Sequence, residues 1–316
     1  MKTNTLSLIL ATATAACTLS LSGQAAQAFT LGSNWNYTMD SGRDGTGAYN
    51  DVGAKSDYEM YGIAMKTVNS KVYVALNANM PLLGNSFAYA ADGNIGWGDL
   101  FLNFTGKSFK DASAANQLFG IRFAGTNDSG AASTGVYKNV AGKNVAADNS
   151  GWSTFDSYVS GTATHVDTTS GVPSGQKGEA GFGDLSAAQA KTYFTAKNGQ
   201  ISDTAYSIAN VISSGTKIGD ISLLGASDLA QVTAGFLGLG GLGKYTLGFS
   251  FDQSLLPSGD AIASLFFECN NDGLAANVKV ESVPEPTTML GLVLGGLGLV
   301  GGKLKKRRQA SAVVAK

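Results

Sequence analysis

The chain has 316 residues, a formal net charge of −1 and only 14% charged residues. This balance excludes the broad basic face of a nucleic-acid-binding protein, because the one dense cluster of cations lies near the C-terminus. Eighteen aspartates, only five glutamates and 42 glycines favour strands joined by turns over long helices.

Residues 1–28 are predicted to be a signal peptide. Lys2 supplies a short positive region, and a mostly apolar stretch follows at Leu6–Leu21. Ala26-Gln27-Ala28 then offers the small-x-small pattern that signal peptidase recognises, so Phe29 is expected to begin the mature protein.

Residues 29–282 are predicted to form one extracellular, antiparallel β-sandwich. Apolar and polar residues alternate with period two, most clearly at 244–252, as in half-buried strands. The expected strands are Tyr58–Lys66, Lys71–Asn77, Leu100–Phe104, Phe119–Phe123, Lys244–Asp252, Ala261–Cys269 and Val278–Val280. A mainly β, jelly-roll-like fold of two sheets is the most economical architecture for this pattern.

One or two short helices are expected within this domain. Asp184 is placed to cap a helix over Leu185–Phe194, and Ser227 is placed to start a helical turn that runs to Gln231. The segment 125–183 is rich in Gly, Ser, Thr and Asn, and we expect long surface loops or irregular strands there.

Residues 40–51 are a candidate calcium-binding loop. Asp40, Asp44 and Asp51 occupy positions 1, 5 and 12 of an EF-hand-like loop, with glycine at position 6. Gly42 stands where an oxygen ligand is usual, and no flanking helices are evident, so an ordinary Asp/Gly turn is the alternative. The segment 270–273 is likewise expected to be a plain turn.

No catalytic or cofactor-binding residue is assigned. His165, the only histidine, is expected to be exposed in a polar loop near Asp167, and one histidine with one cysteine cannot make a usual zinc site. Glu268 is the acid best placed for carboxylate chemistry, with Glu59 and Glu179 as other candidates. The alternative for Glu268 is a carboxylate at the rim of the fold, held by backbone amides or an ion.

Two further residue classes have open interpretations. Cys17 leaves with the signal peptide, unless it is acylated as in a lipoprotein, so Cys269 is expected to be the one thiol of the mature body. We expect Cys269 to be buried and inert, with a reactive or intermolecular thiol as the alternative. Five aromatic residues are candidates for stacking on sugar, and otherwise for the core: Trp35, Tyr37, Tyr49, Trp97 and Trp152.

The C-terminal segment 283–308 has three parts and precedes a tail at 309–316. Pro284-Glu285-Pro286 forms a rigid spacer, and residues 287–302 form an uncharged run rich in Gly and Leu. As a helix this run is about 24 Å long, against about 30 Å for a bilayer core, and snorkelling of Lys303 would close most of that gap. The positive-inside rule keeps the following basic cluster in the cytoplasm: Lys303, Lys305, Lys306, Arg307 and Arg308. A buried core helix is the alternative to this transmembrane span.

Together these three parts resemble the PEP-CTERM sorting signal, which exosortases recognise. The resemblance implies a membrane-tethered intermediate that an exosortase cuts near Pro284-Glu285-Pro286, which releases the body to the cell surface or its polysaccharide matrix. Two body segments, 99–104 and 265–272, are similar to segments of exosortase-dependent surface proteins of cyanobacteria, although Asn270 stands where many relatives have glycine. This second likeness indicates location and not chemistry.

The favoured interpretation is therefore an exported, non-enzymatic surface or matrix protein. Its expected partners are signal peptidase, an exosortase, the inner membrane and, in one alternative, extracellular polysaccharide. That alternative is a lectin-like module that binds polysaccharide through calcium or aromatic rings. A carboxylate-based hydrolase is the third and least favoured hypothesis.

Overall fold

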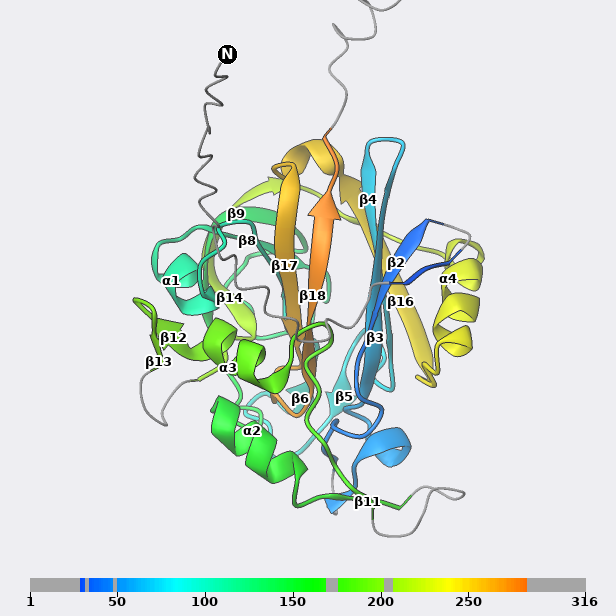
Figure 1. The fold of residues 1–316 in the computed structure, drawn as a ribbon, viewed down its shortest axis with the longest axis vertical. Coiled ribbons are helices and arrows are strands. Elements are labelled where there is room, and N and C mark those ends of the chain that lie inside the picture. Colours follow the sequence, from blue (N-terminus) through cyan, green and yellow to red (C-terminus); the bar gives the residue numbers. More distant parts are fainter. Residues whose placement is uncertain (1–28, 32–33, 48–49, 169–175, 202–206, 283–316) are drawn as a thin grey trace, which may run out of the picture.

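The computed structural model describes residues 29–31, 34–47, 50–168, 176–201 and 207–282, and it contains two six-stranded antiparallel sheets (Figure 1). The first sheet consists, in spatial order, of β1 (Phe29–Leu31), β2 (Trp35–Met39), β3 (Met60–Val68), β4 (Lys71–Ala78), β16 (Tyr245–Asp252) and β15 (Ser222–Leu223). The second consists of β14 (Val211–Gly219), β9 (Gly135–Lys143), β8 (Leu118–Arg122), β7 (Leu100–Asn103), β17 (Gly259–Phe266) and β18 (Gly273–Val280).

Short elements complete the described part of the chain. Three two-residue pairs form small ribbons: β5 (Asn85–Ser86) with β6 (Asn94–Ile95), β10 (Val166–Asp167) with β11 (Gln176–Lys177), and β12 (Ala196–Lys197) with β13 (Gln200–Ile201). The helices are α1 (Phe109–Ala114), α2 (Phe155–Thr162), α3 (Ala187–Thr195) and α4 (Ala226–Gly238), with 3₁₀ turns η2 (Gly53–Lys55) and η3 (Gln253–Leu255).

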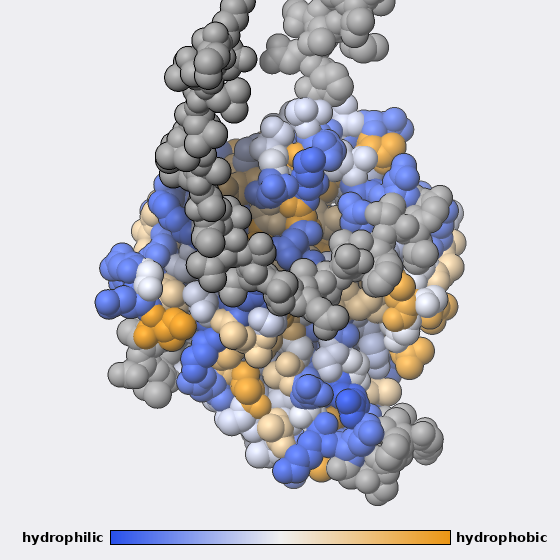
Figure 2. Space-filling view, in the orientation of Figure 1, coloured by the Kyte–Doolittle hydropathy of each residue, from blue (hydrophilic) through white to orange (hydrophobic). Residues whose placement is uncertain are grey.

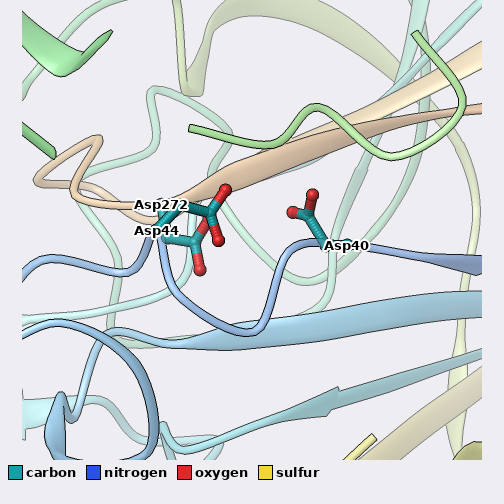
Figure 3. Close-up of side chains that lie close together, drawn as sticks. All are labelled: Asp40, Asp44 and Asp272. Atoms are coloured by element: carbon teal, nitrogen blue, oxygen red, sulfur yellow. The ribbon is translucent and has the colours of Figure 1, made fainter. Parts of the chain in front are cut away.

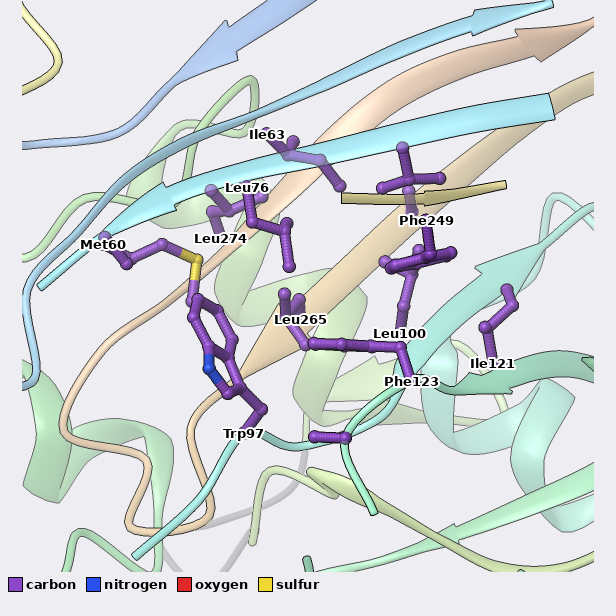
Figure 4. Packing of buried hydrophobic residues seen from close by; sticks show 14 of the residues in the cluster. Met60, Ile63, Leu76, Trp97, Leu100, Ile121, Phe123, Phe249, Leu265 and Leu274 are labelled. Carbon is purple, nitrogen blue, oxygen red and sulfur yellow. The ribbon is translucent and has the colours of Figure 1, made fainter. Parts of the chain in front are cut away.

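The two sheets pack face to face around the largest hydrophobic cluster (Figure 4). Ile63 and Leu76 enter it from the first sheet, and Leu100 and Leu265 enter it from the second. A second cluster joins the outer face of the second sheet to α1, α2 and α3, and a third joins the first sheet to α4. The predicted mainly β, antiparallel fold with few short helices is confirmed.

Strand order in the first sheet follows the chain from β1 to β4. Asn69 and Ser70 join β3 to β4 with φ angles of 52° and 59°, and Val68 pairs with Lys71. Two successive positive φ angles define a type I′ turn, whose twist keeps two consecutive strands side by side. A jelly roll is instead built from Greek keys, in which a long connection returns a strand beside an earlier one. The first four strands are therefore a meander, which the expected jelly-roll likeness did not anticipate.

The helices differ from the prediction at their boundaries. α3 begins after Ser186, whose hydroxyl accepts from the Gln189 amide while the Gln189 side chain accepts from the Ser186 amide. The expected cap, Asp184, instead accepts from Thr38 Oγ1 at 2.9 Å and from the Asn277 amide at 2.8 Å. The assignment of Asp184 as a cap was therefore wrong, because contacts with both sheets hold its carboxylate.

Two helices were not expected, and one is longer than expected. α2 lies within the segment predicted to form loops, where Thr154 caps it and Phe155 and Tyr158 anchor it in the second cluster. α1 begins after the capping residue Ser108. α4 extends the expected turn at 227–231 to thirteen residues.

The predicted signal peptide at 1–28 and the sorting segment at 283–308 lie outside the described residues, as does the tail. Among the residues that the structure describes, none of the helices is both long enough and apolar enough to cross a membrane.

A glycine pair on α4 tests how this helix docks on the first sheet. A Cβ at Gly235 would lie 2.0 Å from the hydroxyl oxygen of buried Tyr37, whose ring meets Phe236 edge-on at 5.1 Å. We expect Gly235→Ala to lower the free energy of unfolding by about 1–3 kcal/mol through overpacking. Gly238→Ala is the matched control, because nothing lies within 4 Å of its Cβ position. It should raise stability by up to about 1 kcal/mol through helix propensity. Equal effects in denaturant unfolding would contradict this docking.

Candidate functional site

Three aspartates meet at the end of the sandwich where β2 ends and β18 begins (Figure 3). Asp40 directly follows β2, Asp44 lies in the same loop, and Asp272 directly precedes β18. One oxygen atom from each carboxylate lies within 4.8 Å of the other two. These side chains therefore come from both sheets and are close enough to share one ligand.

Backbone contacts bring the loop after β2 to the turn between β17 and β18. The Thr46 amide donates to the carbonyl of Asn271 at 3.0 Å, and Nδ2 of Asn271 donates back to the carbonyl of Thr46 at 2.7 Å. The Asp40 amide donates to the carbonyl of Tyr61 at 3.0 Å, which extends the pairing of β2 with β3. The loop and the turn are consequently held in register on either side of the aspartates.

Asp40 and Asp44 each have one oxygen held by the protein and one without a partner. Oδ1 of Asp40 accepts from the amides of Ser41 and Gly183, both at 3.0 Å. Oδ2 of Asp44 accepts from the Gly181 amide at 2.5 Å and from the Tyr158 hydroxyl at 3.0 Å. The other oxygens, Asp40 Oδ2 and Asp44 Oδ1, are buried and make no hydrogen bond.

Asp272 and Glu59 complete a group of four neighbouring acids, which we call the acidic cluster. Oδ2 of Asp272 accepts from the Met60 amide at 2.6 Å, and its Oδ1 accepts from the Gly273 amide at 2.6 Å. Oε2 of Glu59 accepts from the Gly45 amide at 3.0 Å, while its Oε1 is buried without a partner. Asp44, Glu59 and Asp272 are all completely buried.

Burial raises the pKa of every member of the acidic cluster. The pKa of Asp40 rises to about 7, and the pKa values of Asp44, Glu59 and Asp272 rise well above their ordinary range. Loss of hydration is the largest cause, and repulsion from neighbouring carboxylates adds to it. The ion pairs formed by the described lysines all involve other acids.

The expected ligand set at 40–51 is only partly assembled. Asp40 and Asp44 come together, but the carboxylate of Asp51 accepts from Thr168 Oγ1 at 2.8 Å, outside the group of three aspartates. Asp272, expected to belong to an ordinary turn, joins them instead. Sequence reasoning missed it because pairing of β17 with β18, and not spacing along the chain, places it there.

Glu268 is a separate buried acid, only 1% exposed. Its Oε2 accepts from the Gly96 amide at 2.6 Å, and its Oε1 accepts from the Asp128 amide. These contacts match the alternative in which backbone amides hold the carboxylate. Burial raises its pKa from 4.5 to about 8 in spite of both hydrogen bonds.

Histidine and cysteine are both buried. His165 is 8% exposed, its Nδ1 lies 2.8 Å from the carbonyl oxygen of Gly161, and its ring meets Trp152 edge-on. The prediction of an exposed loop histidine was wrong, because this ring contacts Trp152 and the last turn of α2. Cys269 is fully buried as expected, and burial raises the pKa of its thiol. The backbone amide of Glu179 donates to the carbonyl of Arg43, the residue before Asp44, at 3.0 Å.

The aromatic candidates are mostly core residues. Trp35, Tyr37 and Trp97 are each at most 1% exposed, so these rings cannot stack on a sugar at the surface. Trp152 is partly buried, and its indole nitrogen donates to Thr46 Oγ1 at 2.9 Å. Tyr49 lies outside the described residues. Core packing, the alternative interpretation, therefore holds for three of the five.

The raised pKa of Glu268 predicts a pH dependence of stability. The folded state binds this proton more tightly than the unfolded state, so its contribution is full below pH 4.5 and is lost as pH rises towards about 8. Glu268→Gln should remove that part of the slope, which we would measure as the difference in unfolding free energy between wild type and variant at pH 4.5–8. Glu281→Gln, at an exposed position, is the control for the loss of one carboxylate outside the core. A Glu268→Gln slope equal to that of the wild type would contradict the raised pKa.

Comparison with protein-family models matches residues 282–308 to the PEP-CTERM protein-sorting motif. This range includes Pro284-Glu285-Pro286 and the basic cluster predicted to stop transfer. No curated protein and no solved structure matches the chain. The motif implies that the protein is exported, processed by an exosortase and sorted to the cell surface. The chain thus carries a PEP-CTERM protein-sorting motif at its C-terminus.

Proposed function

We propose that the protein is a structural, non-enzymatic component of the cell surface or extracellular matrix. The observation that carries this proposal is the sorting motif at 282–308, which is an address and not a catalytic device. Its transmembrane run at 287–302 and its basic cluster would hold the exported body at the inner membrane until an exosortase acts. The released sandwich would then serve at the surface.

The geometry of the acids supports a structural role. A general acid or base must reach its substrate within hydrogen-bonding distance, directly or through one water. Glu268, Asp44 and Asp272 are at most 1% exposed, and backbone amides hold each of them. Carboxylates buried and held in this way are poorly placed to reach a substrate, which disfavours the hydrolase hypothesis.

Cleavage after Ala28 would retain the described part of the first sheet. Phe29 of β1 pairs with Tyr37 of β2. Signal peptidase cleavage at the predicted position would therefore leave the whole of β1 in the mature protein.

Mass spectrometry of both termini tests the processing scheme. Protein from the surface fraction of the native host should begin at Phe29 and end near Pro284-Glu285-Pro286. Replacement of these three residues by alanine should abolish exosortase processing, so the variant should stay in the membrane fraction with Lys316 intact. Native, wholly soluble protein that retains Lys316 would contradict the proposal.

A second candidate function, polysaccharide binding, has one specific observation in its favour. An open groove of about 1050 Å³ lies between α3 and the strands β17 and β18, and Figure 2 shows the surface hollowed beside these strands. Amide side chains that can exchange hydrogen bonds with sugar hydroxyls line it, among them Asn103, Gln189 and Asn277. The groove is large enough for a small oligosaccharide.

A glycan array separates the two candidate functions. If the surface role is purely structural, the exported protein should bind no glycan, with or without a chelator of divalent cations. Reproducible glycan binding that Gln189→Ala weakens, while exposed Glu281→Gln leaves it intact, would instead favour the polysaccharide-binding module.

A further inference from the structure

We propose that Asp40, Asp44 and Asp272 bind one divalent cation, that Glu59 supports the site, and that the cation is calcium. The site would be structural, joining the two sheets at one end of the sandwich. This inference goes beyond the proposed function and does not depend on it, because binding is a property of the folded body whatever its destination.

The spacing of the three aspartates suits one calcium ion. Calcium takes oxygen ligands at about 2.3–2.6 Å, so two ligands on opposite sides of one ion lie about 4.6–5.2 Å apart. One oxygen from each of Asp40, Asp44 and Asp272 lies within 4.8 Å of the others. Figure 3 shows the carboxylates of Asp44 and Asp272 side by side, with that of Asp40 across from them. All three can therefore reach a single ion.

The oxygens without partners are a second, independent indication of a ligand. Asp44 is completely buried, yet its Oδ1 makes no hydrogen bond, and the same holds for Oε1 of completely buried Glu59. Oδ2 of Asp40 is a third such atom. A buried polar atom without a partner costs about 1–3 kcal/mol, and more when it is charged. A cation among these oxygens would remove that cost.

The hydrogen bonds already present fix the carboxylates as the second shell of a metal site would. Amides of Ser41 and Gly183 hold Oδ1 of Asp40, and the Gly181 amide with the Tyr158 hydroxyl holds Oδ2 of Asp44. Asp40 and Asp44 are thereby oriented while the other oxygen of each stays available. Both oxygens of Asp272 accept from backbone amides, and each has a second lone pair for a cation. Such outer contacts orient metal ligands in known sites.

Gly181 shows how closely the backbone approaches this group. A Cβ at position 181 would lie 2.5 Å from Oδ1 of Asp40 and 2.8 Å from Oδ2 of Asp44. Only glycine leaves space for both carboxylates here. The segment that carries Gly181 therefore packs directly against Asp40 and Asp44.

Charge and ligand chemistry select the ion. The four acids have no ion pair with any described Lys, Arg or His side chain. Their oxygens are hard ligands, and no imidazole or thiolate joins them, which favours calcium or magnesium over zinc or copper. Magnesium usually keeps several of its waters, whereas calcium accepts an enclosed, irregular set of carboxylates and carbonyls. The enclosed geometry therefore favours calcium.

Calcium titration of the exported protein, purified in detergent and stripped with chelator, is the direct test. Calorimetry should give one calcium per chain. At a free calcium concentration one hundred times Kd, the midpoint of thermal unfolding should rise by about 5–10 °C. Magnesium at the same concentration should give a smaller shift.

Three variants locate the site. Asp44→Asn and Asp272→Asn should weaken calcium binding by at least about tenfold, because each removes a charged ligand. In chelator Asp44→Asn should unfold at or above the wild-type temperature, since a neutral amide removes repulsion between buried carboxylates and its oxygen can still accept from the Gly181 amide. Asp272→Asn loses one of its two acceptors for backbone amides and should unfold below the wild type even in chelator. With calcium both variants should unfold further below the wild type than they do in chelator. Asp51→Asn is the matched control from the same loop, and it should bind calcium as wild type does.

Three outcomes would overturn the proposal. The first is a folded wild-type protein that neither binds calcium nor shifts its unfolding midpoint; this result is decisive even if neither cluster variant folds. The second is loss of binding in Asp51→Asn with binding retained in Asp272→Asn, which would place the ion in the 40–51 loop alone. The third is equal destabilisation of Asp44→Asn and Asp272→Asn with and without calcium, which would mean that these acids act only as hydrogen-bond acceptors.

Discussion

Face-to-face packing of the two sheets is the interaction on which the other features depend. Phe123, which follows β8 of the second sheet, stacks on Phe249 of the first at 5.1 Å, and Tyr58, just before β3 of the first sheet, meets Phe267 edge-on at 6.5 Å. Burying one such side chain contributes about 1.5–3 kcal/mol. Because the sheets are held together in this way, the end of β2 and the start of β18 come to the same end of the molecule. The acidic cluster is a consequence of that alignment.

The acidic cluster opposes the core energetically. Like-charged carboxylates in a water-poor site repel one another, and burial of each charge adds a further cost. Protonation is one way to lower this cost, in keeping with the raised pKa of all four acids. A bound cation is the other. Hydrogen bonds from backbone amides offset part of this cost for Asp44, Glu59 and Asp272, which are completely buried. Protonation or a cation can offset more of it, and either one makes stability sensitive to the surrounding solution.

Local patterns explain how much of the fold could be predicted. Alternation over 244–252 predicted β16, and the same rule found β4 and β8 within a residue or two, because each signal lies within one strand. α2 was not predicted because its eight residues lie in a segment of poor helix formers. The cap at Thr154 and the packing of Phe155 outweigh the low helix propensity of that segment. The segment 99–104 contains β7, and the segment 265–272 begins at the end of the neighbouring strand β17, where Phe101 pairs with Ser264. No local rule contains that pairing.

Only the part of the acidic cluster that lies within one loop could be predicted from the sequence. Asp40 and Asp44 share one loop, so spacing alone suggested a cation, whereas Asp272 and Glu59 join them only through the pairing of β17 with β18 and the start of β3. Asp51 was selected by its position in a loop pattern that presupposes flanking helices, and β2 precedes this loop instead. A motif defined in a helical context thus selected two of the three aspartates that meet here, together with Asp51, which does not join them.

Export gives the proposed cation site its physical context. Extracellular calcium modules bind with dissociation constants of about 10⁻⁴–10⁻³ M, which suit the calcium available outside a cell. With such a site, the repulsion within the acidic cluster is uncompensated while calcium is scarce and is relieved once the body meets calcium. Binding free energy then adds directly to folding free energy. The sorting motif would thereby determine where the sandwich is delivered. The acidic cluster would determine where the sandwich becomes most stable, although the two share no residue.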